Sequence, residues 1–108
     1  MLNNFKDERM SSLITELASK YFNIESNKDA LITIIKTEIE NRGKLAKVYF
    51  TVLPDEKEEI VLEFMNRKSR DFRRYLTETR AFSFAPNIKF FLDQGERNRQ
   101  RIEELLSE

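Results

Sequence analysis

The segment from Leu45 to Leu53 alternates between two sets of side chains, and this alternation constrains the fold more than any other feature of the chain. Successive side chains of a β-strand point to opposite faces of a sheet, so one set must face a core and the other must face away from it. The alternating segment is bounded on both sides: Gly43 lies in a predicted turn before Leu45, and Pro54 follows Leu53. We therefore predict a strand over Leu45–Leu53 whose core-facing residues are Ala46, Val48, Phe50 and Val52.

Patterns on either side of this strand predict the element order α-β-β-α-α-β-α. Apolar residues at spacings of three and four indicate helices, β-branched residues indicate strands, and Pro86 separates the last helix pattern from the last strand. The chain of 108 residues is thus predicted to form one α+β domain over 1–108, with helices on one face of a three-stranded sheet. The predicted elements are helices over 5–22 and 96–106, strands over 31–39, 45–53 and 87–93, and two helices between Asp55, the expected N-cap, and Arg80.

The central helical stretch carries a charge where its apolar stripe should continue. On a helical wheel, the stripe formed by Ile60, Val61, Phe64 and Met65 extends to Lys68. Burying a charge is costly, so we predict a break near Lys68 and Ser69 instead of one long helix.

The composition excludes several classes of site. The chain has no Cys and no His, which removes disulfides, thiolate nucleophiles, imidazole bases and the usual zinc ligands. Adjacent acids such as Glu58 and Glu59 lie in surface-type helical sequence that offers no setting for acid–base catalysis. No apolar run reaches the roughly 20 residues of a membrane helix. We therefore expect a soluble, cytoplasmic monomer that is not an enzyme and uses no cofactor, metal or small-molecule substrate.

The formal net charge is zero, with 19 basic and 19 acidic residues, but the two signs are segregated along the chain. Residues 66–92 hold seven Lys or Arg and two acids, whereas residues 51–65 hold one Lys and five acids. At 100° per residue, five arginines of the basic segment fall within an arc of roughly 140° on a helical wheel. This basic arc consists of Arg67, Arg70, Arg73, Arg74 and Arg80.

Such an arc suits a polyanion, because each guanidinium group can donate a fork of hydrogen bonds to a phosphate. We interpret it as an RNA-binding face, and a solvated helix face is the alternative. The zero net charge also leaves open a protein-interaction module that uses the acidic and basic helix faces. Secondary candidates for RNA contact are Lys68 at the predicted break and Lys44, Lys47 and Lys89.

The sheet face that points away from the helices is a second surface of interest. Aromatic and basic sheet faces stack RNA bases in some folds. Because Glu38 interrupts the positive charge here, we interpret this face as an ordinary polar one. Its predicted residues are Lys36, Lys47, Tyr49 and Lys89, with Phe91 as a further candidate because the phase of the last strand is ambiguous.

Several short motifs occur in an order that resembles a known family. Residues 46–49 read Ala-Lys-Val-Tyr, and Pro86, Ile88, Phe90 and Asp93 fit the pattern Pro-x-Leu-x-Phe-x-x-Asp with Ile in place of Leu. Together with the positions that follow, they resemble the ribosome-binding factor A family over nearly the whole chain. The further positions are Glu8, Arg9, Met10, Phe72, Arg73, Leu76, Arg101, Ile102, Leu105 and Leu106.

The resemblance implies a type II KH-like fold. It also implies a non-enzymatic assembly factor that binds the small ribosomal subunit and its rRNA during late maturation and processing of the precursor's 5′ end. In this family a kinked Ala-x-Gly junction between the central helices replaces the RNA-gripping Gly-x-x-Gly loop of other KH domains. This chain has Lys68, Ser69 and Arg70 at the interhelical junction.

Overall fold

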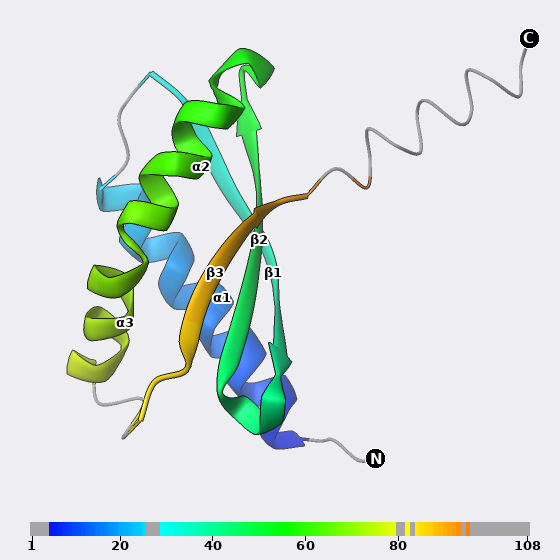
Figure 1. The fold of residues 1–108 in the computed structure, drawn as a ribbon, viewed down its shortest axis with the longest axis vertical. Coiled ribbons are helices and arrows are strands. Elements are labelled where there is room, and N and C mark those ends of the chain that lie inside the picture. The colour runs from blue at the N-terminus through cyan, green and yellow to red at the C-terminus, as the bar shows by residue number, and fades with distance from the viewer. Residues whose placement is uncertain (1–4, 26–28, 80–81, 83, 94, 96–108) are drawn as a thin grey trace, which may run out of the picture.

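The computed structural model describes residues 5–25, 29–79, 82, 84–93 and 95, and its helices and strands form two layers (Figure 1). Two short 3-10 turns, η1 (Asn41–Gly43) and η2 (Asp55–Lys57), precede the second strand and the second helix. The predicted closing helix over 96–106 lies outside the described residues. The main elements are α1 (Phe5–Glu25), β1 (Leu31–Glu40), β2 (Leu45–Leu53), α2 (Glu58–Arg67), α3 (Ser69–Glu78) and β3 (Asn87–Leu92).

The three strands form one sheet in the order β1-β2-β3, in which β1 and β2 are antiparallel and β2 and β3 are parallel. The bounds of β2 are those predicted from its alternation. Its even-numbered side chains are buried, whereas its odd-numbered side chains are partly or fully exposed. In β3 the same alternation buries Ile88 and Phe90 and exposes Lys89 and Phe91, which settles the phase that the sequence left ambiguous.

A bulge interrupts the alternation of β1. The register with β2 shifts between Ile34 and Lys36, so Ile35 is an extra residue in β1 and remains 43% exposed. Ile34 faces the core side before the bulge, and Thr37 and Ile39 do so after it. A regular alternation over 31–39, which the sequence pattern predicts, would place Ile35 on the same face as Thr37 and Ile39. The bulge contradicts this prediction, because an inserted residue reverses the faces of all the side chains that follow.

All three described helices pack on the same face of the sheet, with α1 against β1 and both α2 and α3 against β3 (Figure 1). Phenylalanines from different elements meet at the centre of the core. The ring centroid of Phe22 lies 5.1 Å from that of Phe90 and 5.7 Å from that of Phe72. Full burial of such a side chain stabilises a fold by about 1.5–3 kcal/mol, so these rings hold α1 and α3 against β3.

The central helical stretch is divided at Lys68, as predicted. Helix α2 ends at Arg67 and α3 begins at Ser69. The N–H group of Lys68 donates to the carbonyl oxygens of Phe64 and Met65 at 3.1 and 3.0 Å, which is the tightened geometry of a helix end. The break leaves the Lys68 side chain half-buried, with Nζ 5.9 Å from the ring centroid of Phe64.

The start of α2 differs from the prediction. Asp55 is not its N-cap: it begins the turn η2, and α2 starts at Glu58, with Lys57 in the capping position and no side-chain cap hydrogen bond. The N–H group of Lys57 donates to the carbonyl oxygen of Pro54 at 3.0 Å, so a tight turn separates Pro54 from the helix. The acidic side chains still lie at the helix N-terminus, where the helix dipole favours negative charge.

Candidate nucleic-acid interface

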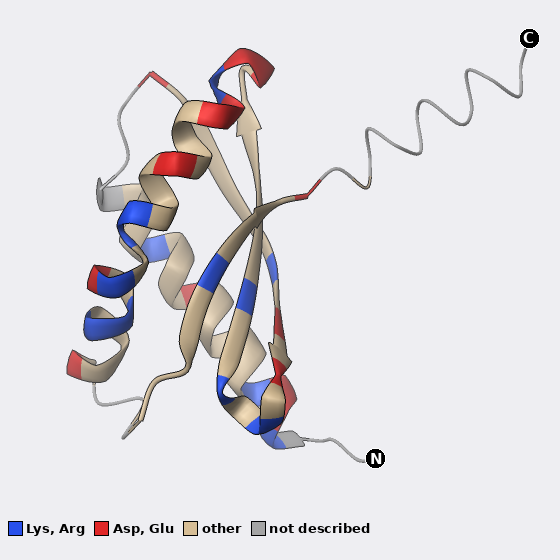
Figure 2. Cartoon of the chain, viewed as in Figure 1, with Lys and Arg blue, Asp and Glu red and all other residues tan. Residues whose placement is uncertain are grey.

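Three exposed arginines lie together on α2 and α3. Arg67 is in the last turn of α2, and Arg70 and Arg74 are one turn apart on α3. Figure 2 shows basic residues along this stretch and acidic residues around the first turns of α2. We call Arg67, Arg70 and Arg74 the outer basic face. Because their side chains are exposed and carry the same sign, they form a surface that suits a chain of phosphates.

The outer basic face is only weakly neutralised by its own helix. Nη1 of Arg74 lies 4.0 Å from Oδ1 of Asp71, and both side chains are at least half exposed. Exposed pairs of this kind contribute little energy and are screened by salt. Arg74 therefore stays available to an anionic ligand.

Arg73 belongs to the same predicted arc, but the structure gives it a second role. Its Nε and Nη2 groups both donate to the carbonyl oxygen of Ala85, each at 3.1 Å. Its guanidinium carbon lies 5.9 Å from the ring centroid of Phe84, which is 72% exposed. Arg73 thus ties α3 to the segment that leads into β3, a contact that no local sequence pattern indicates.

The remaining predicted site residues occupy different places in the structure. Lys68 is half-buried at the interhelical junction, beside Ser69 and Arg70, and Arg80 lies outside the described residues. Lys47 and Lys89 are partners in the β2–β3 register on the sheet face opposite the helices. Lys47 and Lys89 therefore lie on a different side of the molecule from α3, whereas Lys44 lies in the turn before β2.

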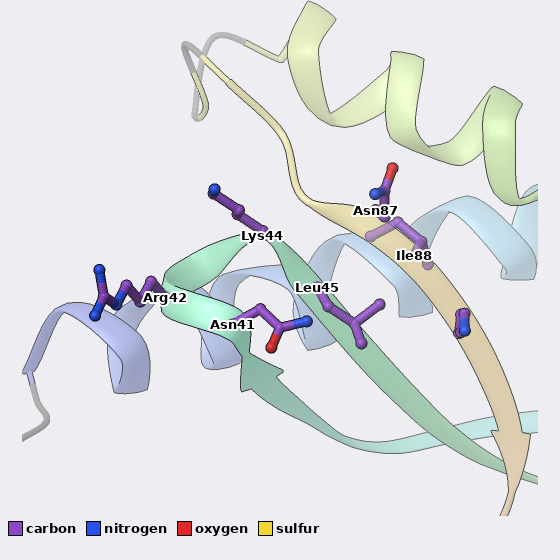
Figure 3. Close-up of a pocket in the computed structure, with 7 residues that line it drawn as sticks. Asn41, Arg42, Lys44, Leu45, Asn87 and Ile88 are labelled. Atoms are coloured by element: carbon purple, nitrogen blue, oxygen red, sulfur yellow. The ribbon is translucent and has the colours of Figure 1, made fainter.

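Lys44 and Lys89 line an open groove of about 770 Å³ at one end of the sheet. Figure 3 shows the residues of the β1–β2 turn on one side of this groove and the first residues of β3 on the other. Three of the lining side chains are cations and two are amides, and no carboxylate is among the described residues that line the groove. The lining residues are Asn41, Arg42, Lys44, Leu45, Asn87, Ile88 and Lys89.

Three groove residues, Asn41, Arg42 and Asn87, are not among the residues predicted for the site. Asn41, Arg42 and Gly43 have positive φ values of 53°, 55° and 86°, so the β1–β2 turn is a run of left-handed backbone. The basic residues flanking Gly43 were a signal that could have been used. Asn87 has no such signal, because it meets the turn only through the pairing of β3 with β2.

Lys47 and Tyr49 interact with acidic residues of β1. A hydrogen bond from Nζ to Glu40, 3.1 Å long, raises the pKa of Lys47. Burial raises the pKa of Tyr49, and the hydrogen bond that its hydroxyl donates to Oε1 of Glu38 at 3.1 Å raises it further. Both side chains therefore keep their protons at neutral pH, one as a cation and one as a fixed donor.

The described residues contain neither a metal site nor a membrane-spanning helix. That part of the chain holds no group of three or more acidic, His or Cys side chains that could bind a metal ion. None of the described helices is both long and apolar enough to cross a membrane.

Known proteins with similar sequences share one description. The family model of ribosome-binding factor A matches residues 6–106 of this chain. A ribosome-binding factor A from Coprothermobacter proteolyticus is 30% identical over 105 residues, which cover 95% of this chain and 77% of the relative.

Solved structures show the same fold. The solution NMR structure of a Thermotoga maritima protein superimposes with a TM-score of 0.70 at 26% identity, covering 88% of this chain and 93% of that protein. The crystal structure of ribosome-binding factor A from Thermus thermophilus gives a TM-score of 0.71 at 14% identity, covering 82% and 97%. At that identity the likeness concerns the fold alone. The predicted KH-like α+β fold is thereby confirmed.

Proposed function

This chain belongs to the ribosome-binding factor A family, and on that premise we propose that it is a non-enzymatic ribosome assembly factor. It binds the small ribosomal subunit and its rRNA during late maturation, when the 5′ end of the precursor is processed. It acts in the cytoplasm as a monomer, through one KH-like domain over residues 1–108, and needs no cofactor or small-molecule substrate.

The outer basic face is the observation that carries this proposal. Arg67, Arg70 and Arg74 are exposed on one side of the α2–α3 pair, and a guanidinium group can donate two parallel hydrogen bonds to one phosphate. Contacts to phosphates position a protein on RNA without reading its bases. The mechanism is therefore recognition of the shape and charge of a folded rRNA segment by α2 and α3.

Co-sedimentation with purified immature and mature small subunits tests this function. The double variant Arg70→Glu/Arg74→Glu should lose most of its binding, because two phosphate contacts become repulsive. For the unmodified protein, neutralising about three phosphates predicts that log K falls with log salt at a slope of about −2 to −3.

A single charge reversal on α1 provides the matched control. Lys20 is exposed and forms an exposed ion pair with Glu16, so Lys20→Glu should leave subunit binding unchanged. Arg70→Glu alone carries the same change in net charge and should weaken binding. Equal binding by these two single variants, or binding that does not respond to salt, would contradict the role of the outer basic face.

A KH-like protein-interaction module using its acidic and basic helix faces is the second candidate, and one observation favours it. The prediction that Ile60 continues the buried stripe of α2 is wrong, because its side chain is 62% exposed between the acidic residues Glu59 and Glu63. An apolar side chain flanked by acids suits a basic protein surface. Partners that stay bound to the protein after RNase treatment of a pull-down would support this module, and loss of all partners would support the RNA-binding function.

A further inference from the structure

The open face of β2 and β3 carries three successive cross-strand pairs whose chemistry changes step by step. Leu45 lies opposite Asn87, Lys47 lies opposite Lys89, and Tyr49 lies opposite Phe91. Neighbouring pairs on the same face are two residues apart, which is about 7 Å along a strand. Amide, basic and aromatic side chains therefore follow one another from the groove toward the middle of the sheet.

The aromatic pair is stacked and held in place. The ring centroids of Tyr49 and Phe91 are 5.6 Å apart, with 28° between the ring planes. The hydroxyl group of Tyr49 donates to Glu38, which fixes one ring, and Phe91 remains 38% exposed. Nζ of Lys47 lies 5.8 Å from the centroid of the Phe91 ring, and a nucleobase that stacks on this ring takes the place of that ammonium group. Stacking accepts any base because every base has a π-face.

The groove beside this pair has the charge that a phosphate requires. Arg42, Lys44 and Lys89 line it with no carboxylate among its described lining residues, and the N–H group of Asn87 donates to the carbonyl oxygen of Lys44 at 2.9 Å, which joins the turn to β3. The groove thus combines side chains from two segments that are distant in the sequence. Both segments border one space (Figure 3).

The acidic residues of the open face are concentrated on β1. Glu38 pairs with Lys36 at 3.4 Å, and Glu40 pairs with Lys47 at 3.1 Å. Lys89, on the far strand, forms no ion pair with any residue that the structure describes. The acids therefore neutralise the β1 side of the face, and the unbalanced positive charge lies along β3 and the groove.

We propose that this surface is a second RNA-binding site, which takes a short single-stranded segment. We call it the strand-face site and define it by Arg42, Lys44, Lys89, Tyr49 and Phe91. A phosphate binds in the groove, and a neighbouring base stacks on Phe91. Lys89 and Phe91 are two residues apart on one face, a separation that a single nucleotide spans.

This inference rests on the proposed function for one point, the identity of the RNA as ribosomal RNA. Lys89, Tyr49 and Phe91 lie on the sheet face opposite α2 and α3, which carry the outer basic face. One molecule can therefore hold a folded rRNA segment on α2 and α3 and an unpaired segment on β2 and β3. The helical face would supply contacts to RNA shape, and the strand-face site would supply a preference for unpaired RNA.

A short oligouridylate titrated into the full-length protein tests this site, with binding followed by fluorescence anisotropy. Phe91→Ala should weaken binding roughly 5- to 100-fold, because base stacking on one aromatic ring is worth about 1–3 kcal/mol. Phe91→Leu keeps apolar bulk without a π-face and should weaken binding to a similar extent. Phe84→Ala is the matched control, since Phe84 is also exposed but contacts Arg73 of α3 and does not line the groove, and it should bind as the unmodified protein does.

The contribution of the cationic side chains of the groove can be measured separately, through the salt dependence of binding. Arg42→Gln/Lys44→Gln should weaken oligouridylate binding and make the slope of log K against log salt shallower by about 1. Lys20→Gln, on α1, should leave that slope unchanged. In amide NMR spectra the oligouridylate should shift the signals of Lys89 and Phe91, while those of Arg70 and Arg74 stay in place.

Several results would overturn the strand-face site. These are no detectable oligouridylate binding, equal binding by Phe91→Ala and Phe84→Ala, or NMR shifts confined to α3. Subunit binding that Phe91→Ala weakens equally before and after rRNA digestion would assign the face to a protein partner instead. The two proposals fail separately: the outer basic face is tested by Arg70→Glu/Arg74→Glu on subunits, and the strand-face site by Phe91→Ala on the oligonucleotide.

Discussion

Phe90 and Phe91 are neighbours in the sequence and occupy opposite environments. Phe90 is 3% exposed and meets Phe22 and Phe72 in the core, whereas Phe91 is 38% exposed and stacks on Tyr49 across the open face. The same contrast runs along β2, where Val48 is fully buried and Tyr49 is not. The two faces of one sheet therefore differ: one forms the core, and the other presents aromatic and basic side chains to solvent.

Exchanging each phenylalanine for alanine gives the largest expected effect and tests this contrast directly. Phe90→Ala should lower the free energy of unfolding by about 3–5 kcal/mol, because it leaves a cavity beside the rings of Phe22 and Phe72. Phe91→Ala should cost only about 0.5–1.5 kcal/mol, the size of one aromatic pair. Urea unfolding followed by circular dichroism measures both. Similar losses in the two variants would mean that Phe91 is part of the core and that the two faces are not distinct.

Arg73 and Arg70 offer a smaller contrast within one helix. Arg73→Lys keeps the charge but cannot reproduce both hydrogen bonds to the carbonyl oxygen of Ala85, so it should lower the free energy of unfolding by about 1–2 kcal/mol. Arg70→Lys, at an exposed position, should change it by less than about 0.5 kcal/mol. Urea unfolding again supplies the measurement. An unchanged stability in Arg73→Lys would show that the link between α3 and the start of β3 contributes nothing.

The smallest expected effect concerns the proton of Tyr49. Burial and the hydrogen bond to Glu38 raise the pKa of this hydroxyl in the folded state, so the folded protein holds the proton more tightly than the unfolded chain does. This contribution to stability is complete below the ordinary tyrosine pKa of about 10 and is lost as the pH rises through the raised value.

An NMR pH titration of the Tyr49 ring measures this shift. The midpoint should lie above that of free tyrosine. Glu38→Gln should lower it part of the way, because the substitution removes the negative charge and leaves the burial. A midpoint equal to that of free tyrosine would mean that Tyr49 is not held against Glu38, and the prealigned ring of the strand-face site would lose its support.

Much of the fold could be predicted because the relevant patterns are local. The alternation in Leu45–Leu53 defines the bounds and the buried side of β2, and the position of Lys68 predicts the division between α2 and α3. The bulge at Ile35 could not be predicted in the same way. An apolar β-branched residue fits a regular strand as well as a bulge, and only the pairing with β2 distinguishes them.

The candidate site likewise has one part that local sequence patterns predict and one part that only the tertiary structure shows. The position of Arg70 and Arg74 on one side of α3 follows from helical spacing alone, since residues four apart share one side of a helix, whereas Arg67 lies across the break at Lys68. The role of Arg73 toward Ala85 does not, because the partner is a backbone carbonyl beyond the end of the helix. Nothing in the identity of an arginine shows whether its guanidinium group meets solvent or a carbonyl oxygen.

By itself, the sequence determined the order of the described elements, the buried face of β2, the break at Lys68 and the family. The tertiary structure alone decided that Phe91 lies beside Tyr49 and that Lys89 and Asn87 share a groove with Arg42 and Lys44. The physical reason is the parallel pairing of β3 with β2, which joins segments separated by both central helices. Periodicity within a segment tells which side chains share a face, but only the pairing of segments tells which faces meet.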